Sequence, residues 1–178
     1  MTVGFSLALV MVLLTLGRDG RWLPVYGVIC AFTSASLGGG VLIVVAVVAL
    51  LVFNMLAWLG LRGFAVSSHA ERLSMMKATA PVLAILLMQL VLALSGASLG
   101  LVPTLGVGLV LAGLCSAAYG VPLSQFCGLL MAVDGLLVMA CVLSSWGLLV
   151  MAVALWGVLA VLGATLLPRL AWRRVEDQ

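Results

Sequence analysis

The stretch VLIVVAVVALLVFNMLAWLGL, residues 41–61, decides the fold, because it runs from Val41 to Leu61 without one charged residue. A helix needs about 20 apolar residues to cross the hydrocarbon core of a membrane. Hydrophobic residues make up 66% of the chain and charged residues 7%, more apolar surface than a soluble domain of 178 residues can bury. Since lipid cannot hydrogen-bond an open strand, we predict an all-α integral membrane protein in which residues 1–178 form a single transmembrane helical domain.

Further apolar segments flank this stretch on both sides, each bounded by turn residues or charges. With it they number about seven transmembrane helices: Thr2–Gly17, Leu23–Leu37, Val41–Leu61, Ala78–Leu94, Leu101–Ala118, Leu123–Leu143 and Gly147–Leu167. The first two are short for a membrane span, so we expect both to extend into their flanks.

All Lys and Arg residues follow odd-numbered segments. They are Arg18 and Arg21 after the first, Arg62, Arg72 and Lys77 after the third, and Arg169, Arg173 and Arg174 after the seventh. Merging either pair of short segments would put basic clusters on both faces of the membrane. The positive-inside rule therefore predicts a multi-pass protein of the cell inner membrane, with the N-terminus outside and the C-terminus in the cytoplasm.

The polar parts of the chain give little indication of a partner outside the membrane. No basic n-region or A-x-A site precedes Arg18, so we expect the first segment to stay as an anchor. The longest polar stretch, Arg62 to Lys77, is at most an amphipathic connector in the membrane interface. The net charge of +3 fits basic clusters facing anionic headgroups and implies no nucleic-acid partner.

Residues for catalysis or cofactor binding are scarce in the sequence. Cys30, Cys115, Cys127 and Cys141 all lie in apolar segments without a CxxC pair, which is typical of packing residues. His69, the only histidine, lies in a polar loop beside Glu71. Without clustered ligands, a phosphate loop or a nucleophile elbow, we predict no metal, no cofactor and no catalytic residues.

Small residues recur on two of the predicted helices. Gly106, Gly108 and Gly113 belong to the fifth, and Gly157, Ala160, Gly163 and Ala164 to the seventh. Small-residue faces let helices approach closely in lipid. Packing within the chain and packing against another subunit both explain them.

Asp134 is the only ionisable residue well inside a predicted span. A mid-membrane Asp costs roughly 3 kcal/mol on insertion scales, so an interaction must offset it. The carboxyl is either a proton relay or counter-ion, or an uncharged hydrogen-bonded group that locks two helices. Candidate polar neighbours are Gln125, Gln89, Asn54 and Ser124.

A family resemblance begins on the sixth segment. The run QFCGLLMAVDG, residues 125–135, resembles the Q-x-x-G-x-x-x-x-E-N-G segment of component E of formate-hydrogenlyase-type membrane hydrogenases, which is similar in turn to subunit K of NADH-quinone oxidoreductase. The run LLPRLAWR, residues 166–173, resembles the family's L-L-x-R-x-x-W-R ending. The similarity covers roughly the last third of the chain. By this resemblance, residues 101–178 are the three-helix part that is similar to subunit K.

The sequence departs from this family at its charged positions. The family's membrane Glu falls on Val133, its neighbouring Asn on Asp134, and an acidic residue of the seventh helix on Trp156. A lysine expected on the third helix has no counterpart between Val41 and Leu61. One residue along a helix is about 100° of rotation, so Asp134 would face a different direction from the family's Glu.

Two functions from different classes remain open. The resemblance implies a non-catalytic membrane subunit of a complex-I-like or membrane-hydrogenase-like ion-translocating assembly, packed beside large antiporter-like subunits and other small membrane subunits. The alternative is a stand-alone small-solute transporter or exporter, although the chain shows no internal repeat and few intramembrane polar groups. An assembly factor is a third interpretation.

Overall fold

The computed structural model describes residues 23–61, 101–118 and 122–176. Every element in these ranges is a helix, and the short connections between helices are turns. The helices are α2 (Leu23–Ala35), α3 (Val41–Leu61), α5 (Leu101–Ala118), α6 (Pro122–Val142) and α7 (Trp146–Glu176). The prediction of an all-α protein is therefore confirmed for the described part of the chain.

The helix bounds agree closely with those predicted from apolar runs. The bounds of α3 and α5 are the predicted ones, whereas α2 ends at Ala35 and α6 is displaced by one residue. The predicted spans Thr2–Gly17 and Ala78–Leu94 lie outside the described residues, as does the polar stretch after Leu61.

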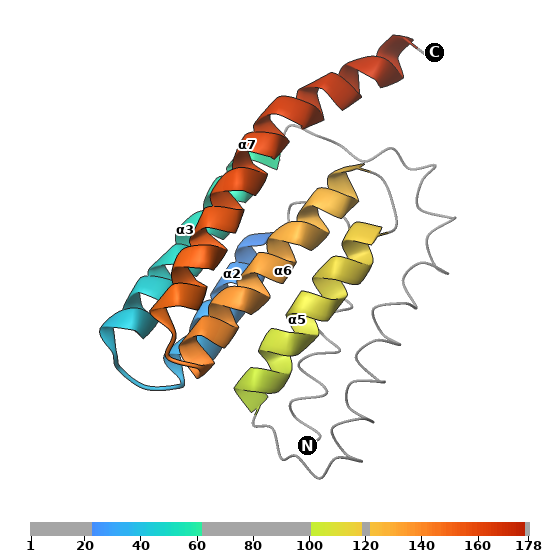
Figure 1. Cartoon of the computed structure of the whole chain (residues 1–178). Coiled ribbons are helices and arrows are strands. Elements are labelled where there is room, and N and C mark those ends of the chain that lie inside the picture. The colour runs from blue at the N-terminus through green and yellow to red at the C-terminus, as the bar shows by residue number, and fades with distance from the viewer. Residues whose placement is uncertain (1–22, 62–100, 119–121, 177–178) are drawn as a thin grey trace, which may run out of the picture.

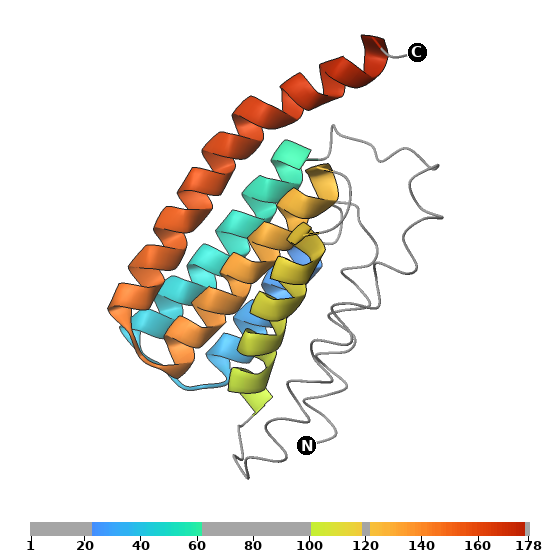
Figure 2. The same ribbon diagram turned by 45° about the vertical axis from the view of Figure 1, so that its right-hand side comes forward.

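The largest difference is the length of α7, which continues past the predicted end at Leu167 to Glu176, with Pro168 inside the helix. A proline removes one backbone hydrogen bond and bends a helix, but it need not end one. Figure 2 shows α7 curving and extending beyond the other described helices.

Each helix pairs with its neighbour in the chain, and α6 holds the pairs together. The pairs are α2 with α3, α5 with α6, and α6 with α7, while α2 and α3 also pack on α6. The turns of residues 36–40 and 143–145 lie at one end of the bundle (Figure 1). At the other end, Leu23, Leu61, Leu130 and Leu167 form one apolar cluster.

Three of the described helices are long and apolar enough to cross a membrane: Val41–Leu61, Gln125–Val142 and Trp146–Arg169. The bundle buries 61% of the α6 span but 28% of the α3 span and 17% of the α7 span. The outer faces of α3 and α7 therefore expose valines, leucines and methionines along their length. A contiguous apolar surface of this kind indicates a membrane protein, because water would not tolerate it.

Two glycines of α5, Gly106 and Gly113, pack within the chain. A Cβ on Gly106 would lie 2.8 Å from the Met139 sulfur, and a Cβ on Gly113 would meet the backbone of α6 at Gly128. On α6, a Cβ on Gly135 would lie 2.8 Å from the Gly106 carbonyl oxygen. These glycines let α5 and α6 approach closely, as small residues do in lipid. Of the two explanations for the small-residue face of α5, the structure supports packing within the chain.

Candidate functional site

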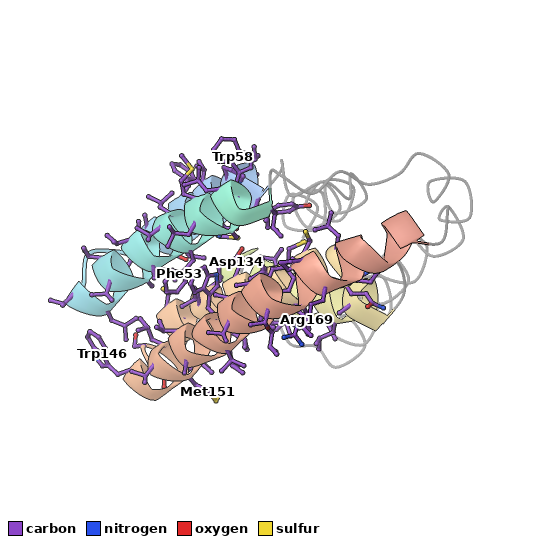
Figure 3. The ribbon with its side chains drawn as sticks, turned by 90° about the horizontal axis from the view of Figure 1, so that it is seen from above. Phe53, Trp58, Asp134, Trp146, Met151 and Arg169 are labelled. Carbon is purple, nitrogen blue, oxygen red and sulfur yellow. The ribbon has the colours of Figure 1, made fainter. Side chains whose placement is uncertain are left out.

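Asp134 lies in the middle of α6 with its side chain inside the bundle. It is 2% exposed, and Figure 3 shows it in the interior, away from the outward-pointing Trp58, Trp146 and Met151. The Asn54 side chain of α3 is 3% exposed, and its Nδ2 donates a hydrogen bond of 3.0 Å to Asp134 Oδ1. One interhelical hydrogen bond thus joins two helices that are each long enough to span the membrane.

The same Asn54 amide is held in place by its own helix. Its Nδ2 also donates to the Leu50 carbonyl oxygen, one turn earlier, at 2.9 Å. Because the Asn54 amide donates to two acceptors, the Leu50 carbonyl oxygen and Asp134 Oδ1, its orientation is fixed and one N–H points at α6.

Besides α3 and α6, a third helix, α2, borders the Asp134–Asn54 contact with Gly27 and Cys30. A Cβ on Gly27 would lie 2.7 Å from the Asn54 Cβ and 3.0 Å from the Leu50 carbonyl oxygen, so only glycine allows this approach. Cys30, one turn further along α2, is fully buried. The site is therefore a buried contact among α2, α3 and α6.

The second carboxyl oxygen, Asp134 Oδ2, is buried and has no hydrogen-bond partner among the described residues. Leaving one buried polar atom unpaired costs on the order of 1–3 kcal/mol, and more if the group is charged. Arg169 is the only basic residue whose side chain the structure describes, and it is exposed near the far end of α7. Within the described part of the chain, no cation compensates a charge on Asp134.

An aromatic pair lies beside the Asp134–Asn54 contact. Phe53 of α3 and Trp156 of α7 stack with ring centroids 4.3 Å apart and planes 13° from parallel. Both rings pack on the apolar core, which includes Val133. Val133 and Trp156 therefore both contribute apolar side chains to this part of the bundle.

Of the other predicted neighbours of Asp134, Gln125 alone has a described side chain, and it does not reach Asp134. Gln125 is half-buried on α6, nine residues before Asp134, which is about 13 Å along the helix axis. Gln89, the Ser124 side chain and His69 lie outside the described residues. Among the described residues, no group of His, Cys, Asp or Glu could hold a metal ion.

Sequence reasoning included Asn54 among several candidates but missed Gly27 and Phe53. The signal that could have found Gly27 is weak: a glycine inside an apolar helix is common in membranes. Helix α3 is apolar on every side, so no periodicity indicated that Asn54 and Phe53 face inward.

Comparison with known proteins adds no family assignment: no protein-family model, curated protein or solved structure matches this chain.

Proposed function

We propose that this chain is a non-catalytic membrane subunit of an ion-translocating assembly of the complex-I-like or membrane-hydrogenase-like kind. The observation that carries the proposal is the buried Asp134–Asn54 contact at the centre of an apolar bundle. The resemblance of residues 125–135 to the membrane-hydrogenase subunit supports the proposal, since Asp134 belongs to the run that is similar to the segment with that family's membrane carboxylate.

The surface of the bundle supports a subunit role. Helix α7 buries only 17% of its span within the chain, and the outer face of α3 is similarly apolar. Membrane lipids and large antiporter-like subunits would cover these faces in the proposed assembly. The stand-alone transporter is less well supported, because the described interior buries only a few polar side chains, Thr33, Ser34, Asn54 and Asp134, whereas a substrate site usually needs several that converge.

Asp134 acts in this proposal as an uncharged, hydrogen-bonded link between α3 and α6. An ionised carboxylate in this position would need a buried cation, and the described residues supply none. The aromatic pair beside it and Val133 in the core both argue against a line of charged groups through this part of the bundle.

The proposed topology has seven transmembrane helices, an outside N-terminus and a cytoplasmic C-terminus, in the cell inner membrane. Three features of the described bundle support it: α2 begins, α3 ends and the α7 span ends at the same end of the molecule. The basic residues Arg21, Arg62 and Arg169 immediately flank these three helix ends in the sequence.

Purification of the tagged chain in mild detergent, followed by mass spectrometry, tests the subunit role. We expect stoichiometric antiporter-like chains, absent when an unrelated multi-pass protein carries the same tag. Expressed without its partners, the chain should be degraded because its apolar faces are left uncovered. A stable homo-oligomer that moves a small solute across liposomes would contradict the proposal.

A further inference from the structure

We draw no further inference here: the strongest candidate, the apolar groove lined by α3, α6 and α7 at the end of the bundle opposite the turns, carries none, because nothing in the structure shows what covers it.

Discussion

The buried Asp134 carboxyl is stabilised inside the described apolar bundle by a hydrogen bond to only one of its two oxygens. Its Oδ1 accepts one hydrogen bond from Asn54, and its Oδ2 has no partner among the described residues. An interhelical hydrogen bond in a membrane protein contributes about 0.6 kcal/mol on average and at most about 1.7 kcal/mol. The contact thus offsets part of the cost of burying the group.

Replacing Asp134 by asparagine separates a structural role from a proton relay. The amide oxygen of Asp134→Asn can still accept from Asn54, so we expect normal recovery of the complex and nearly normal ion movement in vesicles. Asp134→Leu, which removes the acceptor, should weaken the α3–α6 contact by about 1 kcal/mol. A normal complex that has lost ion movement in Asp134→Asn would make the carboxyl a relay, and loss of assembly would indicate a cation on a neighbouring subunit.

Gly27 gives a second prediction at the scale of one residue. A Cβ there would press on the Asn54 Cβ and on the Leu50 carbonyl oxygen, and a backbone atom cannot move aside cheaply. Gly27→Ala should therefore destabilise the protein by about 1–3 kcal/mol, measured as a lower unfolding midpoint in detergent. The matched control is Gly157→Ala on α7, where a Cβ meets nothing within 4 Å. Equal midpoints for the two variants would refute the close approach of α2 to α3.

At the scale of helices, the sequence predicts where elements lie much better than which way they face. Length and charge gave the bounds of α3 and α5, because lipid leaves an apolar run no alternative to a helix. Rotation was not predictable, since an all-apolar helix has no polar face to orient it. The end of α7 was also missed, because the predicted segment stopped with the apolar run at Leu167, whereas the helix continues through Pro168 to Glu176.

The stacked rings of Phe53 and Trp156 link α3 to α7 and can be measured by a double-mutant cycle. Phe53→Leu and Trp156→Leu each remove one ring, and the double variant removes both. We expect a coupling energy of about 0.5–1.5 kcal/mol in detergent unfolding, the usual value for an aromatic pair. Leu51→Ala with Trp156→Leu serves as the control cycle, since Leu51 is exposed on α3 and should show no coupling. Additive effects for Phe53 and Trp156 would contradict the stacking.

At the scale of the whole molecule, the bundle has one basic end and one uncharged end. The turns of residues 36–40 and 143–145 contain no Lys or Arg, whereas Arg62 follows α3 and Arg169 ends the α7 span. This asymmetry is what orients a membrane protein, because cytoplasmic loops retain basic residues.

Topology reporters test the whole arrangement at three positions. A reporter after Gln178 should be active in the cytoplasm, and reporters within residues 38–40 and at Ser144 should be active outside, because those two turns share one end of the bundle. Agreement between the two turn positions tests the described bundle, and their opposition to Gln178 tests the orientation. If the Ser144 and Gln178 reporters were active on the same side, α7 would not cross the membrane, and the exposed apolar surface of that helix would need another explanation. If all three reporters were active on the opposite side from the one expected, the described bundle would remain consistent with the result, but the positive-inside rule would not hold for this chain.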